Sequence, residues 1–231
     1  MNSSSQLQAI IFDMDGLLVN SEPVWEEAET EVFGAYGIQV TPEVRTQLIG
    51  MRNDEFLGQM RRIYNIQASF ETLQNAVLSR MLALIPEKAA PKPGALEMLH
   101  YAREHGIPTA IASSSPGVII EAVVASRQWT ELIPVRCSAE FLPKGKPAPD
   151  VYLHAAEQLG SAPHRCLALE DSPNGARAAV AAGMICYAVP DLSHTTIEAF
   201  AGITNFVFDS LYTVLSQLQN GGWQHHTNQQ D

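Results

Sequence analysis

The sequence predicts an α/β protein in which a Rossmann-like, doubly wound parallel sheet carries an inserted all-helical cap. Two patterns support this class. Short apolar runs alternate with amphipathic helical stretches over most of the chain, and one long interval after the first run contains only helical patterns. Of the 231 residues, 46% are hydrophobic, which is enough to form a core and excludes disorder for most of the chain.

The apolar runs are too short for helices, and several contain β-branched residues, so we expect them to be buried strands. They occupy residues 7–12, 108–112, 134–138, 166–169, 184–189 and 205–208. Amphipathic stretches lie between most of them, at residues 94–104, 117–128, 149–159 and 173–182. This alternation predicts right-handed crossovers between parallel strands.

From residue 23 to about residue 87, apolar side chains recur at helical spacing and no strand pattern is found. Residues 41–43 have the types that begin a helix. We expect about four helices here, which form a lid beside the sheet. The expected divisions are residues 1–22 and 91–231 for the core domain, 23–90 for the cap domain and 220–231 for a disordered polar tail.

Composition excludes several classes of partner. The chain has 14 lysines and arginines against 25 aspartates and glutamates, a formal charge of −11 that disfavours nucleic acid. Cys137, Cys166 and Cys186 have no CxxC spacing and are expected to be reduced core residues. No apolar run reaches the roughly 18 residues of a membrane helix. No positive charge precedes the first run, so we expect no secretory signal and a cytoplasmic location. By default we expect a monomer, and no membrane partner.

Two carboxylates follow the first predicted strand, because Asp13 and Asp15 come directly after Phe12 and are followed by Gly16. Sites in open parallel sheets lie beyond the carboxyl ends of the strands. A polar turn would explain one such aspartate. Two at this spacing repel each other and require a cation or a raised pKa on one of them, which favours a functional role.

The fourth predicted strand ends in a similar way, at Glu170 and Asp171. Four acidic side chains then lie at the carboxyl ends of two strands of one sheet. Such a site suits a hard cation with oxygen ligands, and Mg²⁺ is the simplest ion that would relieve the crowding. Ser172, which precedes Pro173, is expected to cap a helix whose N-terminus faces the same region.

Hydroxyl groups and a lysine follow two other predicted strands. We expect Ser115 to cap the next helix and Pro116 to be its first residue. Ser113 is then available, together with the backbone N–H groups at the helix start, to bind a phosphate or carboxylate. Lys146, in a Gly/Pro-rich loop, would be a solvated lysine if considered alone. Near an acidic metal site it would neutralise both a carboxylate nucleophile and a substrate phosphate.

These groups together favour phosphoryl transfer through an aspartyl-phosphate. One aspartate would be bound to metal and would attack phosphorus, while its neighbour, kept protonated, would act as general acid. Mg²⁺, the lysine and a serine would hold the non-bridging oxygens. Hydrolysis of phosphate monoesters requires rate accelerations of ~10²¹, which only a concentrated electrostatic site supplies.

Four short motifs, in order along the chain, resemble those of the haloacid dehalogenase superfamily. They lie at residues 12–16, 111–114, 146–147 and 169–172. Within it the chain resembles the β-phosphoglucomutase-like sugar-phosphatase branch, which has a helical cap after the first strand and includes 2-deoxyglucose-6-phosphatase-like and hexitol-phosphatase-like members. The resemblance covers residues 7 to about 218.

The resemblance implies a role for each matching residue. Asp13 would be the nucleophile and a metal ligand. Asp15 would bind the metal through its backbone carbonyl and would act as acid and base. Asp171 would be a metal ligand, with Glu170 as a ligand or as a partner of the ligands. The phosphate-binding residues would be Ser113, Ser114 and Lys146.

Cap residues would select the substrate, and their patterns are less specific. Residues 49–52 resemble the cap loop that faces the site, where Gly50 would lie close to the substrate. Arg52 would hold a sugar hydroxyl or phosphate, unless it is a surface arginine. Glu22 would contact substrate or cap the first cap helix. The other glutamates of that helix, Glu26, Glu27, Glu29 and Glu31, are expected to form a solvated face.

Two departures from the family pattern bear on the reaction. Asn20 occupies a position where many relatives have aspartate, and Trp25 one where the mutase members have a histidine that positions the acid/base group. An indole cannot do this proton work. The tryptophan at this position therefore favours a Mg²⁺-dependent phosphatase over a β-phosphoglucomutase-like phosphomutase. The expected substrates are small phosphomonoesters, such as sugar or hexitol phosphates, and Trp25 is expected to be one of the residues that bind them.

Three other activities of this scaffold fit less well. A dehalogenase has no use for Asp15 or for Mg²⁺. A phosphonate hydrolase would need a lysine in the cap, and Lys88, at the edge of the linker, is the only one between residues 23 and 90. A sugar-phosphate-binding module without catalysis would be expected to lack the nucleophile or the acid, and Asp13 and Asp15 are both present.

Overall fold

A five-stranded parallel sheet, in the order β3-β2-β1-β4-β5, forms the centre of the computed structural model. The described residues are 7–41, 43–44, 48, 51–221 and 223. The strands are β1 (Ala9–Phe12), β2 (Thr109–Ser113), β3 (Val135–Ser138), β4 (Cys166–Glu170) and β5 (Ile185–Ala188). Phe12 pairs with Ile111 on one side and Leu169 on the other, so the strand ends that carry the polar motifs lie at one edge. The predicted doubly wound parallel fold is confirmed.

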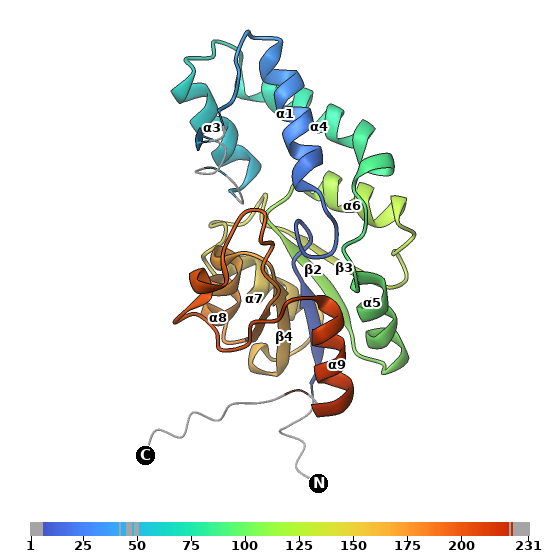
Figure 1. Ribbon diagram of the computed structural model, residues 1–231. Coiled ribbons are helices and arrows are strands. Elements are labelled where there is room, and N and C mark those ends of the chain that lie inside the picture. The colour runs from blue at the N-terminus through green and yellow to red at the C-terminus, as the bar shows by residue number, and fades with distance from the viewer. Residues whose placement is uncertain (1–6, 42, 45–47, 49–50, 222, 224–231) are drawn as a thin grey trace.

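The two faces of the sheet differ in side-chain size. Ile10 and Phe12 belong to a core of large side chains, whereas Ala110 and Ala168 belong to a second core made mostly of alanines and cysteines. Helices α5, α6 and α9 pack with the first core, and α7 and α8 cover the second face (Figure 1). Their bounds are α5 (Ala95–Glu104), α6 (Gly117–Ser126), α7 (Asp150–Gln158), α8 (Pro173–Ala181) and α9 (Leu211–Gly221), with short 3₁₀ helices at Pro163–Arg165 and Ile197–Phe200.

Helices inserted after the first strand lie beyond the carboxyl edge of the sheet, at the top of Figure 1. They are α1 (Glu22–Gly34), α3 (Asn53–Ile63) and α4 (Phe70–Lys88). Helix α4 packs against both α1 and α3, and also against α6 of the core. The helix start predicted at residues 41–43 lies partly outside the described residues, and so does most of the predicted tail at 220–231.

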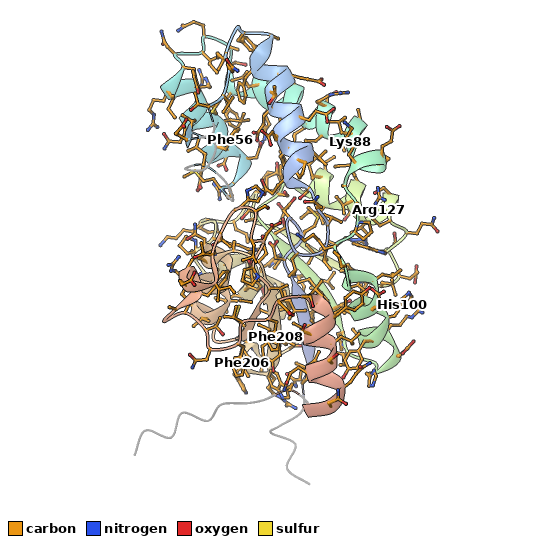
Figure 2. The ribbon with its side chains drawn as sticks, viewed as in Figure 1. Phe56, Lys88, His100, Arg127, Phe206 and Phe208 are labelled. Carbon is orange, nitrogen blue, oxygen red and sulfur yellow. The ribbon has the colours of Figure 1, made fainter. Side chains whose placement is uncertain are left out.

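The strand predicted at residues 205–208 is wrong. Only Val207 forms a bridge, with Ala188, and no ladder follows. The physical reason is that the hydroxyl of Thr204 replaces the next ladder bond: it accepts from the N–H of Phe206 at 3.1 Å and donates to the carbonyl of Cys186 in β5 at 2.7 Å. The apolar pattern reflects side-chain packing instead. Phe206 and Phe208 are labelled in Figure 2. Their rings lie 5.0 and 4.9 Å from the ring of Tyr187.

The chain passes between the core and the cap helices twice, at Asn20 and at Ala90, and these two segments lie side by side. The N–H of Asn20 donates to the carbonyl of Ala90 at 2.8 Å. Beside them, Arg127 of α6 donates to the carbonyls of Ile85 and Pro86 at the end of α4, at 3.0 and 2.6 Å (Figure 2). These contacts attach the base of the helical insert to the α6 side of the core.

The three cysteines are buried and unpaired, as predicted. Burial raises the pKa of the Cys137 and Cys166 thiols to about 11, so they stay protonated. Among the described residues, no helix is both long and apolar enough to cross a membrane.

Candidate active site

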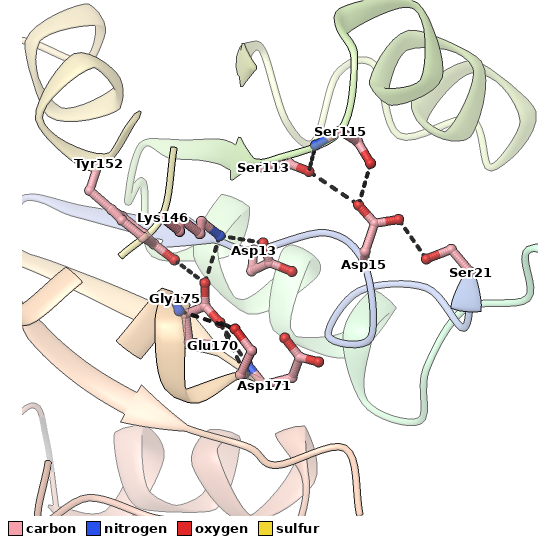
Figure 3. Close-up of polar contacts among 11 residues, drawn as sticks. Asp13, Asp15, Ser21, Ser113, Ser115, Lys146, Tyr152, Glu170, Asp171 and Gly175 are labelled. Carbon is pink, nitrogen blue, oxygen red and sulfur yellow. Dashed lines mark hydrogen bonds and ion pairs between the residues drawn. The ribbon is translucent and has the colours of Figure 1, made fainter. Parts of the chain in front are cut away.

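A buried lysine holds the acidic side chain at the end of β1. Asp13 is 6% exposed, and its Oδ1 accepts a hydrogen bond of 2.5 Å from Nζ of Lys146. The same ammonium donates to Oε1 of Glu170, at the end of β4, at 2.6 Å (Figure 3). The second oxygen of Asp13, Oδ2, accepts no hydrogen bond from any residue in the described part of the chain.

Glu170 is completely buried, and donors surround both of its oxygens. Oε1 also accepts from the hydroxyl of Tyr152 at 2.8 Å, and Oε2 accepts from the backbone N–H groups of Asp171 and Ser172, each at 3.1 Å. Ser172 caps α8 as predicted, because its hydroxyl accepts from the N–H of Gly175. The N-terminus of α8 therefore helps to stabilise the buried carboxylate.

Asp171 completes a cluster of three carboxylates. One oxygen each of Asp13, Glu170 and Asp171 lies within 4.8 Å of the others. Gly16, at φ +84°, leaves room for Asp171, because a Cβ at Gly16 would lie 2.2 Å from Asp171 Oδ2. No hydrogen bond from a described residue reaches the Asp171 carboxylate. Unpaired carboxylate oxygens at these separations fit a divalent cation.

The electrostatics of the cluster also fit a cation. Burial raises the pKa of Asp13 well above its ordinary value; Lys146 opposes this rise, and the charges of Glu170 and Asp15 add to it. Burial likewise raises the pKa of Asp171, and Asp13 and Glu170 add to the effect. Burial alone would lower the pKa of Lys146, but its two carboxylate partners raise it, so the ammonium stays charged. One lysine cannot balance three carboxylates, whereas a bound divalent cation would favour their ionised forms.

Asp15 turns away from this cluster and accepts four hydrogen bonds (Figure 3). Its Oδ1 accepts from the hydroxyl of Ser21 at 2.6 Å and from Nε1 of Trp25 at 3.2 Å. Its Oδ2 accepts from the hydroxyls of Ser113 and Ser115, at 3.1 and 2.7 Å. The donors come from the start of α1 and the end of β2, so both the insert and the core orient this side chain.

The prediction that Ser115 caps the helix after β2 is wrong. The N-cap is Pro116 and the helix begins at Gly117, whose N–H donates to the carboxylate of Glu140 at 3.1 Å. Ser115 therefore turns to Asp15 instead. A serine before a proline is typical of a cap, which is why the sequence pattern did not indicate this role.

A cavity of about 400 Å³ separates the carboxylate cluster from the inserted helices. Its core side contains Asp13, Asp15, Ser114, Lys146 and Asp171. Its other side consists of Glu22, Trp25, Glu29, Leu48, Met51, Asn53 and Phe56. The loop after β5 contributes Asp191, His194 and Thr195, which no sequence motif indicated.

Only some of the residues predicted to bind substrate or phosphate line the cavity. Glu22 and Trp25 lie on the wall of the cavity, and Gly50 lies outside the described residues. Ser113 is fully buried and does not line the cavity, whereas Ser114 does.

Arg52 connects the insert to the core rather than lining the cavity. Its guanidinium pairs with Asp54 at 2.6 Å and donates to the carbonyls of Ala139 and Leu142, at 3.3 and 2.9 Å. The side chain is only 13% exposed, so it is not a solvated surface arginine. The loop that leads to Lys146 and the start of α3 are therefore held together.

The expected solvated face of α1 is wrong at one position. Glu27 and Glu31 form ion pairs with Arg80, but Glu29 is 6% exposed and lines the cavity. Glu29 follows Trp25 by four positions, which places both on one face of the helix. That spacing was the available sequence signal for Glu29. No comparable pattern indicates Tyr152.

The fold and the site define a class of enzyme: a hydrolase with a carboxylate centre at the edge of a parallel sheet, closed over by an inserted helical cap. A family model for haloacid dehalogenase-like hydrolases matches residues 7–183, and the chain belongs to this family. The resemblance inferred from the four motifs is thus confirmed.

Known relatives include several phosphatases. Hexitol phosphatase B of Escherichia coli (strain K12) is 37% identical over 195 residues, which cover 82% of this chain and 86% of that protein. The phosphorylated carbohydrates phosphatase of Thermotoga maritima is 29% identical over 178 residues, covering 77% and 82%.

Solved structures agree with this relationship. CbbY from Rhodobacter sphaeroides in complex with phosphate superposes with a TM-score of 0.78 at 29% identity, over 89% of this chain and 95% of that one. A putative β-phosphoglucomutase from Thermotoga maritima superposes with a TM-score of 0.73 at 27% identity, over 92% and 98%.

Proposed function

We propose that the chain is a Mg²⁺-dependent phosphatase that hydrolyses small phosphomonoesters, in particular sugar or hexitol monophosphates, through an aspartyl-phosphate on Asp13. The observation that carries this proposal is the contact of Asp13 with Lys146 on one wall of a cavity that the inserted helices close from the other side. Similarity to hexitol phosphatase B and to the phosphorylated carbohydrates phosphatase supports the substrate class.

Two aspartates would carry the reaction. In the first step Oδ2 of Asp13 attacks phosphorus, the bond from phosphorus to the ester oxygen breaks, and that oxygen takes a proton from Asp15. In the second step a water attacks phosphorus and gives its proton to Asp15, while the bond from phosphorus to Asp13 breaks. The products are the alcohol and inorganic phosphate, and both aspartates return to their starting forms.

The other polar groups would stabilise charge. Lys146 fixes Oδ1 of Asp13 and offers a permanent positive charge to the phosphoryl oxygens. Ser114, which lines the cavity, would bind the same phosphoryl group. Ser113, also predicted to bind phosphate, is buried behind it, and its hydroxyl would orient Asp15. Mg²⁺ would be held by Asp13 and Asp171 with Glu170 beside them and by the backbone carbonyl of Asp15. When bound, it would neutralise charge on the carboxylates and on the phosphoryl oxygens.

A β-phosphoglucomutase-like phosphomutase is the second candidate, favoured by the likeness to the putative β-phosphoglucomutase. Trp25 argues against it. Its Nε1 donates to Asp15, and an indole N–H is a donor only, so this residue cannot carry protons to or from the acid. A sugar-phosphate-binding module without catalysis would not need Asp13 and Asp15 together in one cavity.

The proposed organisation of the chain follows from the same arrangement. Residues 23–90 would form the cap domain and act as a lid over a core of residues 1–22 and 91–231. The adjacent crossings at Asn20 and Ala90 support this division. A monomeric state and a cytoplasmic location are part of the proposal.

Phosphate release with and without Mg²⁺ tests the function, against a panel of hexose, hexitol, pentose and nucleoside monophosphates. We expect Mg²⁺-dependent release from sugar or hexitol phosphates. Asp13→Asn should reduce turnover by about 10³-fold or more while its circular dichroism spectrum is unchanged. Conversion of a hexose 1-phosphate into the 6-phosphate without release would indicate the mutase, and binding without either product would indicate the module.

A further inference from the structure

On the cap side of the cavity, one buried side-chain amide has no partner among the described residues. Asn53, the first residue of α3, is 8% exposed and lies on the cavity wall. Its Nδ2 atom is buried and makes no hydrogen bond to any residue that the structure describes. Buried donors without acceptors cost free energy and are rare in folded proteins, so such a group next to a cavity points to a ligand.

The preceding residue explains why Asn53 stays in this position. Arg52 is bonded to the core carbonyls of Ala139 and Leu142. It also packs closely on the loop before Lys146, since a Cβ at Gly145 would lie 3.0 Å from its Cδ. The first turn of α3 is therefore anchored on the loop that carries Lys146, and the backbone of Asn53 is held at the cavity wall.

We propose that Asn53 is a specificity-determining residue that donates a hydrogen bond to a hydroxyl of the leaving alcohol, and that the substrates are monophosphates of neutral polyhydroxy compounds. The inference rests on the proposed phosphatase function and narrows its substrate class. The side-chain amide of Asn53 is shielded from water, so its N–H gains a hydrogen-bond acceptor only when a substrate oxygen lies next to it.

The charges around the cavity favour a neutral alcohol over one with a second anionic group. Among the described residues, Lys146 is the only lysine or arginine on the wall, and it is paired with Asp13 and Glu170. On the cap side Glu22 adds negative charge, which contributes to the raised pKa of Asp171. A second phosphate or carboxylate would meet carboxylates here, whereas a hydroxyl meets a free donor.

The test compares Asn53→Asp with the wild-type protein. Aspartate has nearly the same shape as asparagine, but its ionised carboxylate accepts hydrogen bonds and donates none. The measured quantity is kcat/KM for glucose 6-phosphate divided by kcat/KM for phenyl phosphate, whose leaving group has no other hydroxyl. We expect this ratio to fall about tenfold, the loss of one hydrogen bond. Gln59→Glu, the same type of exchange on α3 outside the cavity, should leave the ratio unchanged.

Monodeoxy hexose 6-phosphates identify the hydroxyl that Asn53 binds. In the wild-type protein one of these substrates should react about tenfold more slowly than the parent sugar phosphate. In Asn53→Asp the same deletion should have a smaller effect, because the partner is already lost. Equal effects of every deletion in both proteins would overturn the role of Asn53.

Two further outcomes separate the inference from the function on which it rests. If the wild-type protein releases no phosphate from any ester, including phenyl phosphate, the proposed function itself is overturned. If it is active but prefers glucose 1,6-bisphosphate to glucose 6-phosphate, or if Asn53→Asp lowers both esters equally, the function stands and the inference about Asn53 is overturned.

Discussion

The indole Nε1 of Trp25 donates a hydrogen bond of 3.2 Å to Oδ1 of Asp15. This contact links the first helix of the insert to the loop after β1, which carries Asp13 and Asp15. The other donors to Asp15 are hydroxyls, so Trp25 is the only one of the four donors that cannot also accept. The position of α1 therefore affects the orientation of the proposed acid directly.

Replacement of Trp25 by phenylalanine tests this link. Trp25→Phe keeps an aromatic ring on the cavity wall but removes the donor, so we expect kcat for a hexitol phosphate to fall by about 3- to 10-fold. Trp129→Phe is the control, because Trp129 is buried outside the cavity. It should lower the melting temperature and leave kcat/KM close to the wild-type value. An unchanged kcat in Trp25→Phe would show that the indole does not position Asp15.

Asp15→Asn tests the proton transfer. An amide cannot protonate the leaving oxygen, so turnover of glucose 6-phosphate should fall by about 10²- to 10⁴-fold. The loss should be much smaller with p-nitrophenyl phosphate, whose leaving group needs little assistance from an acid. Initial rates with both esters, at saturating Mg²⁺, provide the comparison. Losses of the same size with both substrates would contradict the role of Asp15 as general acid.

Gly175→Ala tests how tightly the buried carboxylate of Glu170 is held. A Cβ at Gly175 would lie 1.7 Å from Glu170 Oε1, so the carboxylate would have to leave its donors. We expect the free energy of unfolding, from urea denaturation, to fall by about 1–3 kcal/mol.

Gly58→Ala is the matched control, because nothing lies within 4 Å of a Cβ at this position of α3. It should raise the free energy of unfolding by up to about 1 kcal/mol, since alanine favours helices more than glycine. Equal effects of the two alanines would mean that Glu170 moves without cost.

The ion pair between Asp191 and Lys92 predicts a pH-dependent contribution to stability. Burial alone would raise the pKa of Asp191, but hydrogen bonds from Ser193 and Lys92 outweigh it and lower the pKa. A carboxyl group with a lowered pKa stabilises the fold above its unfolded value of about 3.9, and this contribution is lost as pH falls through the folded pKa.

Asp191→Asn should therefore lower the free energy of unfolding by about 1 kcal/mol at pH 7, and by almost nothing below about pH 3. Urea denaturation of both proteins from pH 2 to pH 8 gives the difference directly. A difference that stays constant across this range would show that the charge of Asp191 is not what stabilises the loop.

The sequence by itself determined the sheet and the place of its site. Strands β1, β2 and β4 are buried on both faces, so they appear in the sequence as short apolar runs. The polar residues Asp13, Ser113 and Glu170 mark where these runs end. Parallel strands bring their carboxyl ends to one edge. The sequence therefore places these residues at one edge of the sheet, while the spatial order β2-β1-β4, which makes them neighbours, is decided by the tertiary structure.

Only the tertiary structure decided which donors and acceptors meet around these residues. The hydroxyl of Ser115 reaches Asp15 across 100 positions of the chain, and Arg52 reaches Leu142 across 90. Helical periodicity assigns a residue to a face, but the partner of that face depends on how helices far apart in sequence pack together. For this reason the amide of Asn53, whose Nδ2 has no partner in the described part of the chain, is visible only in the folded structure.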